Sequence, residues 1–202
     1  MHHLRAYFLA EKNFLGDDMK QLAVCASGKG TLIPDIHKKV TITLVVIDRY
    51  CRAADVAKSL GIPVVLVPRE GYFQKGTFDR RAHSAALAER FREYGISCVA
   101  LAGYRTLLAR PALEAVGGRV LNVHPSLLPL YPGLNAVEQA LKAYDRYTGC
   151  TVHYVDEGMD TGRIIGKTHV PIYRSDTVQS LRRSIQEAEK ELYPRIIRQE
   201  FF

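Results

Sequence analysis

Residues 21–47, QLAVCASGKGTLIPDIHKKVTITLVVI, contain the pattern that decides the fold. They begin with the apolar run Gln21–Ala26, pass through a glycine-containing turn into the helical pattern Thr31–Lys39, and return to apolar residues at Thr41–Ile47. Short apolar runs without alternating polar residues are typical of strands buried on both faces. A strand, a helix and a second strand in this order predict one unit of a parallel α/β sheet.

The same alternation continues along the chain. Further strands are predicted at Pro63–Val67, Cys98–Leu101 and Arg119–Val123, and further helices at Cys51–Leu60, Thr77–Tyr94 and Leu107–Val116. In the last third, two predicted strands, Val152–Val155 and Ile164–Pro171, are close enough to pair as a hairpin. A final helix is expected over Thr177–Ile197, with its end marked by Pro194. We therefore expect an α/β, Rossmann-like fold: a mostly parallel twisted sheet with helices on both faces, made mixed by the added C-terminal strands.

Length and composition predict one globular domain. The chain has 202 residues, of which 47% are hydrophobic and 24% charged, as is ordinary for such a domain. Because Met19 reads as a start into the first strand, residues 1–18 are predicted to be an N-terminal extension and residues 19–202 the domain. Four cysteines lie far apart without a C-x-x-C pair, which indicates reduced thiols and a cytoplasmic protein.

The charge pattern excludes some classes of partner. The formal net charge is +7, but the basic residues are dispersed and do not alternate with aromatic ones, so we expect no nucleic-acid partner. No apolar stretch approaches the roughly 20 residues that a membrane span needs, so no membrane partner is expected either. The sequence leaves open whether the protein is a monomer or a homodimer.

The turn after the first strand, Ala26–Thr31, has glycines at positions 28 and 30. A glycine-rich turn from a strand into a helix can direct backbone N–H groups at a phosphate. The spacing is neither that of a P-loop nor the complete dinucleotide-binding pattern. On the residues alone, a purely structural turn and an anion site are equally open.

Asn122 and His124 lie at the end of the predicted strand Arg119–Val123, where a proline-rich loop begins. Alternate residues of an extended chain point to the same side, so both polar side chains should project beyond the carboxyl end of a strand. Open α/β sheets bind their ligands there. A histidine in such a loop is more often a local hydrogen-bonding group, but the neighbouring asparagine and an acidic loop about 30 residues later favour a catalytic interpretation.

That acidic loop, Asp156–Gly162, carries three carboxylates and two glycines. Metal binding is one interpretation, but the spacing is not that of a calcium loop, so no metal is predicted. The alternative is that one carboxylate stabilises the protonated imidazole of His124, which can then donate to a developing oxyanion. An amide, an imidazolium and a carboxylate suit the tetrahedral intermediate of acyl transfer. Ser126 lies in no nucleophile elbow, which favours direct transfer to an amine.

These residues resemble the folate-dependent formyltransferase family. The segments Asn122–Pro129, Tyr131–Gly133 and Thr148–Gly162 match its motif in order and spacing, and the likeness runs from about Lys20 to Arg198. The resemblance implies a formyltransferase fold and direct transfer of the formyl group of 10-formyltetrahydrofolate, a co-substrate, to a primary amine. Members that formylate glycinamide ribonucleotide in purine biosynthesis are the most similar. Transfer to another amine, such as an amino sugar or a siderophore precursor, is the alternative.

The resemblance also implies roles for individual residues. The catalytic residues would be Asn122, His124 and Asp160. The folate-binding residues would be Lys75, Tyr104, Arg105, Thr106, Leu107, Asn122, Asp156, Glu157, Gly158, Met159 and Asp160. The small-molecule amine, expected to be phosphorylated, would be bound by Gly28, Gly30, Thr31, Leu32 and Glu189. Leu32 stands where the family usually has an asparagine, which keeps the alternative amines open.

Overall fold

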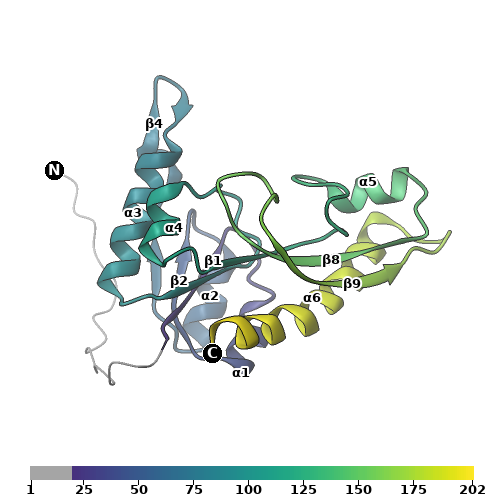
Figure 1. The fold of residues 1–202 in the computed structure, drawn as a ribbon, viewed down its shortest axis with the longest axis horizontal. Coiled ribbons are helices and arrows are strands. Elements are labelled where there is room, and N and C mark those ends of the chain that lie inside the picture. Colours follow the sequence, from purple (N-terminus) through teal and green to yellow (C-terminus); the bar gives the residue numbers. More distant parts are fainter. Residues whose placement is uncertain (1–19) are drawn as a thin grey trace.

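The computed structural model of the protein describes residues 20–202, and the predicted extension 1–18 lies outside this range (Figure 1). The main sheet has seven strands in the order β3-β2-β1-β6-β7-β8-β9. Their bounds are β1 Leu22–Ala26, β2 Ile42–Ile47, β3 Val64–Leu66, β6 Cys98–Leu101, β7 Val120–His124, β8 Tyr147–Tyr154 and β9 Ile164–Pro171. The first five strands in this order pair in parallel, and β8 and β9 are antiparallel. The predicted mixed α/β sheet is confirmed.

Helices cover both faces of the sheet (Figure 1). The six α-helices of residues 20–202 are α1 Ile33–Lys39, α2 Arg52–Ser59, α3 Arg80–Glu93, α4 Arg110–Ala115, α5 Ala136–Lys142 and α6 Val178–Phe201. The central position of β1 in the sheet explains why its sequence is apolar throughout. Leu22 and Val24 pack into the core beneath α1, α2 and α6, whereas Ala23 and Cys25 pack into the core beneath α3 and α4. Both faces of the strand are buried, so neither can be polar.

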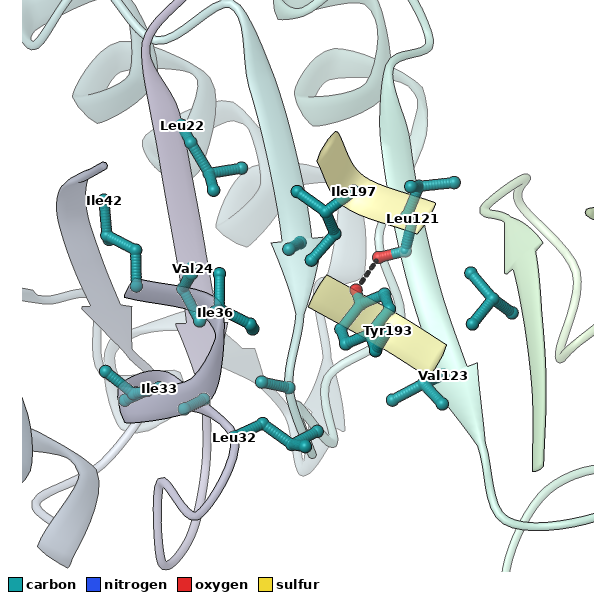
Figure 2. Close-up of a cluster of buried hydrophobic side chains, with 14 of the residues drawn as sticks. Leu22, Val24, Leu32, Ile33, Ile36, Ile42, Leu121, Val123, Tyr193 and Ile197 are labelled. Carbon is teal, nitrogen blue, oxygen red and sulfur yellow. Dashed lines mark hydrogen bonds between the residues drawn. The ribbon is translucent and has the colours of Figure 1, made fainter. Parts of the chain in front are cut away.

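Helix α6 is tied to the sheet by a buried tyrosine. Tyr193 is fully buried, and its hydroxyl donates a hydrogen bond of 2.8 Å to the carbonyl oxygen of Leu121 in β7 (Figure 2). The hydrogen bond satisfies a polar group that would otherwise be costly to bury. The helix therefore has a fixed position relative to the strand that carries Asn122 and His124.

The prediction that α6 ends near Pro194 is wrong, because the helix continues through this residue to Phe201. Proline removes one hydrogen bond inside a helix. Here Pro194 is itself buried, and Ile196, Ile197 and Phe201 beyond it are buried too. Burial of these apolar side chains, each contributing about 1.5–3 kcal/mol, outweighs the lost hydrogen bond.

Other boundaries also differ from prediction. Helix α3 begins at Arg80 rather than Thr77, because Thr77–Phe78 forms β5, which pairs with β4, Phe73–Gln74, after the short 3₁₀ helix η1, Arg69–Tyr72. The side chain of Asp79 then caps α3 by accepting the N–H of Ala82 at 2.9 Å. Helix α4 begins at Arg110 rather than Leu107. Strand β8 begins at Tyr147 rather than Val152, and α5 lies within a segment for which no helix was predicted.

The four cysteines are free thiols, as predicted. Cys25, Cys98 and Cys150 are buried in strands, and Cys51 is partly buried. None of the helices in residues 20–202 has the length and apolar character needed to cross a membrane.

Candidate active site

A cavity of about 840 Å³ lies at the carboxyl ends of the parallel strands. Its wall includes the turns that follow β1 and β6, the end of β7, and the cavity-facing side of α6. The chain leaves β1 toward β2 on one side, and β6 lies on the other, so the cavity sits where the strand order reverses. This is where ligands bind in open α/β sheets, and the volume suits a small molecule.

The structure brings the three predicted catalytic side chains together around Asp160. One carboxylate oxygen, Oδ2, lies 3.2 Å from Nδ1 of His124 and accepts the backbone N–H of Gly133 at 2.8 Å. The other, Oδ1, lies 3.4 Å from Nδ2 of Asn122. All three side chains line the cavity. A single carboxylate thus orients the amide and the imidazole.

His124 is 5% exposed, and both of its ring nitrogens face acceptors. Nε2 lies 2.7 Å from the carbonyl oxygen of Tyr131, and Nδ1 faces Asp160. A carbonyl oxygen can only accept, so Nε2 carries hydrogen. A protonated ring would supply a second N–H for the carboxylate and would bring its positive charge to the cavity wall.

A second buried histidine, His153, belongs to the same cluster and was missed in the sequence. It lies directly opposite Asn122 in the antiparallel β7–β8 pair. Its Nδ1 is 2.7 Å from the carbonyl oxygen of Tyr154, so this nitrogen donates and Nε2 of the neutral ring accepts from Nδ2 of Asn122 at 3.2 Å. His153 therefore fixes which way the Asn122 amide points. The strand that carries His153 was predicted, but its antiparallel pairing with β7, which brings the two side chains together, was not.

The environment of Asp160 keeps the carboxylate ionised. Burial opposes ionisation, but the hydrogen bond from the Gly133 N–H and the nearby positive charge of His124 hold the pKa below its ordinary value of 3.8. The backbone of Asp160 has a φ of 55°, a left-handed conformation that costs energy for a residue with a side chain. Such conformations are concentrated at functional sites.

The turn after β6 carries four of the predicted folate-binding residues, and all of them line the cavity: Tyr104, Arg105, Thr106 and Leu107. They differ in how they are held. The side chain of Leu107 is 39% exposed, whereas Thr106 is 4% exposed and its hydroxyl donates to Asp48, outside the cavity wall.

The acidic loop is only partly directed at the cavity. Asp156, Gly158 and Met159 line it with Asp160, but Glu157 does not. A carboxylate oxygen of Glu157 accepts the backbone N–H of Arg110 at 3.0 Å, and its carbonyl accepts a hydrogen bond from Arg80. We conclude that Glu157 holds the loop against α4 rather than facing the cavity.

Lys75, a further predicted folate-binding residue, lies apart from the cavity wall. It lies in the turn between β4 and β5, with a φ of 51°, and is not among the residues that line the cavity. Arg69 is the basic residue from this segment that does. Its guanidinium stacks over Phe78, 4.5 Å from the ring centroid, and its buried Nε has no hydrogen-bond partner among residues 20–202. An unpaired guanidinium is suited to a ligand carboxylate.

The turn after β1 lines the opposite end of the cavity, with Gly28, Lys29, Gly30, Thr31 and Leu32 in the wall. Position 30 requires glycine for a structural reason, because its φ is +69° and a Cβ there would lie 2.7 Å from Cα of Ala53 in α2. Gly28 has no such constraint, since a Cβ would meet nothing within 4 Å. Leu32 is 6% exposed and packs into the core.

Glu189 of α6 lies in the same end of the cavity and is 9% exposed. Burial raises its pKa from 4.5 to about 7, because an ionised carboxylate loses hydration there. A buried carboxyl group that faces a cavity is suited to accept hydrogen bonds from an amine or a hydroxyl.

The raised pKa of Glu189 predicts a stability difference that depends on pH. A carboxyl group with a raised pKa in the folded state contributes stability that is complete below its unfolded pKa of about 4.5 and is lost as the pH rises through about 7. Glu189→Gln stays neutral, so above pH 7 the variant should be more stable than wild type by about 3 kcal/mol. Thermal unfolding of both proteins from pH 5 to 9 measures this. A difference in Tm that does not change with pH would contradict it.

Within residues 20–202, no three His, Cys, Asp or Glu side chains are grouped so that they could hold a metal ion.

An open α/β sheet that gathers an amide, an imidazole and a carboxylate at its strand ends defines the class of this protein as a group-transfer enzyme of Rossmann-like architecture. Residues 20–197 match the family described as formyl transferase. The chain belongs to this family.

Several relatives have more specific names. The phosphoribosylglycinamide formyltransferase of Bacillus subtilis (strain 168) is 36% identical over 189 residues, covering 90% of this chain and 94% of the relative. The trifunctional purine biosynthetic protein adenosine-3 of Bos taurus is 36% identical over 182 residues, which are 86% of this chain but only 18% of that longer protein. The crystal structure of glycinamide ribonucleotide transformylase 1 from Symbiobacterium toebii superposes with a TM-score of 0.83 at 37% identity, covering 93% of this chain and 90% of that one.

Proposed function

We propose that the protein transfers the formyl group of 10-formyltetrahydrofolate to the primary amine of glycinamide ribonucleotide, a reaction of purine biosynthesis. The observation that carries the proposal is the cluster in which Asp160 orients both Asn122 and His124 at a cavity large enough for two ligands. The names of the relatives support the choice of amine. The substrates are soluble and small, so we place the reaction in the cytoplasm. We expect the enzyme to act as a monomer or as a homodimer.

The two ends of the cavity suit the two ligands. The turn after β6, the acidic loop and Arg69 would hold the folate, with backbone groups on the pterin and the free guanidinium on the carboxylate end. The turn after β1 would hold the acceptor phosphate, where Lys29 adds positive charge. Glu189 would accept hydrogen bonds from the acceptor. Asn122 and His124 lie in the wall of the same cavity, where the transferred group must be.

The co-substrate supplies a formyl carbon that is open to attack by an amine. As this carbon becomes tetrahedral, its oxygen gains negative charge, and the imidazolium of His124 stabilises that charge. Asn122 has two amide hydrogens. One is held by His153 at 3.2 Å, and the other makes only a long contact of 3.4 Å with Asp160. The weakly held hydrogen is the one that can turn to the oxyanion. Asp160 stabilises the charged ring and can receive a proton from the attacking amine. When the tetrahedral carbon collapses, its bond to N10 of the folate breaks, and that nitrogen takes up the proton as tetrahydrofolate leaves.

A second acceptor is favoured by one observation. Leu32 is buried and apolar at the position where an asparagine would donate a hydrogen bond in the acceptor turn. Without that donor, a phosphate would be held by backbone groups and Lys29 alone. An amine of another class, such as an amino sugar or a siderophore precursor, is therefore the alternative acceptor for the same chemistry.

The experiment that separates these acceptors measures release of tetrahydrofolate from 10-formyltetrahydrofolate in the presence of single amines. Glycinamide ribonucleotide should give saturable turnover with the highest kcat/KM of the amines tested. A higher kcat/KM with an amino sugar would show that the acceptor differs while the chemistry holds. Absence of formyl transfer to every amine, with saturating folate, would contradict the proposed function itself.

A further inference from the structure

Asp48 is a buried carboxylate that the proposed reaction does not use directly. It follows the carboxyl end of β2, is 0% exposed, and does not line the cavity. Burying an ionised carboxylate is costly unless its oxygens are hydrogen-bonded. The carboxylate of Asp48 therefore needs hydrogen-bond donors at fixed positions. These donors show which segments of the structure Asp48 holds together.

One of these donors, Thr106, comes from the cavity wall. The hydroxyl of Thr106 donates to Oδ2 of Asp48 at 2.7 Å. The adjacent Arg49 donates from Nε to Oδ1 at 3.1 Å and from its terminal nitrogen to Oδ2 at 3.4 Å. Ser27 donates as well, and although burial opposes ionisation, these hydrogen bonds together keep the pKa of Asp48 below 3.8. The carboxylate is thus ionised and fully engaged.

Ser27 extends the connection to the backbone of the folate turn. Its hydroxyl oxygen accepts the N–H of Arg105 at 2.9 Å, and its own N–H donates to the carbonyl of Gly103 at 3.3 Å. The carbonyl of Asp48 in turn accepts the N–H of Arg69 at 3.4 Å. Two separate segments of the folate end of the cavity are therefore tied to one buried residue, which lies across β1 from the turn after β6.

We propose that Asp48 is a positioning residue, which holds the turn from Gly103 to Leu107 in the conformation that binds the folate co-substrate. The inference rests on the proposed function, and it deepens the description of the folate end of the site. Strands β1, β2 and β6 are joined by their own ladders of backbone pairs, so the sheet does not depend on the carboxylate. The turn beyond β6 has no such ladder, and it is the part of the structure that Asp48 and Ser27 fix.

The test uses the full-length protein and the product tetrahydrofolate as the binding probe, measured by calorimetric titration. Asp48→Asn keeps the shape but places an amide N–H₂ group among donors from Thr106 and Arg49, so the network cannot be satisfied. We expect the Kd for tetrahydrofolate to rise by about 10- to 100-fold, the scale of losing a hydrogen bond to a charged group. The KM for 10-formyltetrahydrofolate should rise in parallel, while kcat at saturation and the KM for the amine change little.

Three further variants keep the test decisive. Asp55→Asn removes the same charge at an exposed position of α2 and should leave the Kd unchanged. Thr106→Val, which leaves the carboxylate in place, should weaken tetrahydrofolate binding in the same direction, and Thr106→Ser should restore it. If Asp48→Asn does not fold, the Thr106 pair decides. If the position contributes only to stability, Thr106→Val should lower the Tm and leave the Kd for tetrahydrofolate unchanged.

The outcomes distinguish failure of the positioning role of Asp48 from failure of the proposed function. If wild type binds tetrahydrofolate and both Asp48→Asn and Thr106→Val bind it equally well, the positioning role is wrong and the proposed function is untouched. A fall in kcat without a change in the Kd or the KM for folate would also overturn it. If the wild-type protein itself binds no tetrahydrofolate, the proposed function fails.

Discussion

Replacing His124 by alanine is expected to lower kcat for formyl transfer by roughly 10²–10³-fold, the usual cost of losing a donor to a developing oxyanion. The structure supports this magnitude because the ring is buried, lines the cavity and is oriented at both nitrogens, by Tyr131 and Asp160. The ring is therefore oriented before the reaction begins. Steady-state release of tetrahydrofolate at saturating concentrations of both substrates measures the effect, and Asn122→Ala should fall in the same range.

His169 offers a matched control. It lies on β9, is exposed, and is not among the residues lining the cavity, so His169→Ala should turn over at the wild-type rate. Near-wild-type activity in His124→Ala would defeat the proposed mechanism. A loss of activity that is entirely due to a raised KM would show that the ring serves binding rather than the chemical step.

The second large effect is expected for Asp160→Asn, which should lower kcat by about 10³-fold. The carboxylate accepts from Gly133, faces Nδ1 of His124 and lies beside the Asn122 amide. An amide whose oxygen replaces Oδ2 places its N–H₂ group against the Asn122 amide at the Oδ1 position, so it cannot accept from all three donors, and it removes the charge that favours the imidazolium. Single-turnover formyl transfer separates this chemical effect from product release. Retention of more than about a tenth of the wild-type rate would be inconsistent with the role given to Asp160.

Asp160→Asn should also change the dependence of stability on pH. The pKa of Asp160 is lowered in the folded protein from 3.8, so its contribution to stability is present above about pH 4 and is lost as the pH falls through the lowered value. Wild type should therefore exceed the variant in Tm at pH 7, and the difference should shrink below pH 4. A difference that persists unchanged at pH 3 would mean that packing, rather than the charge, accounts for it.

The parts of the fold that could be predicted from the sequence are those with a local signal. The run Gln21–Ala26 is apolar because both faces of β1 are buried, and the pair Asn122 and His124 shares one side of β7 because alternate residues do. Asp160 came from the family motif, and the structure brings its carboxylate to both side chains.

What could not be predicted depends on contacts between distant segments. Thr148 and Thr151 are buried in the first half of β8, although their side chains are polar, so no apolar run marked this part of the strand. His153 contacts Asn122 only because β8 lies beside β7. Asp48 contacts Thr106 only because β2 and β6 flank β1. The continuation of α6 through Pro194 likewise depends on the core into which its last turns pack.

The two halves of helix α6 have different roles, and this limits which of its residues can change when the enzyme adapts to a new acceptor. Its amino-terminal half presents Arg182, Gln186 and Glu189 to the acceptor end of the cavity, whereas its carboxyl-terminal half is packed through Tyr193, Ile197 and other apolar side chains (Figure 2). Substitutions that retune acceptor preference are therefore tolerable only in the first half, where side chains meet solvent and ligand. The second half fixes the position of the helix against the sheet. A changed side chain in the first half therefore keeps its place relative to the reacting group.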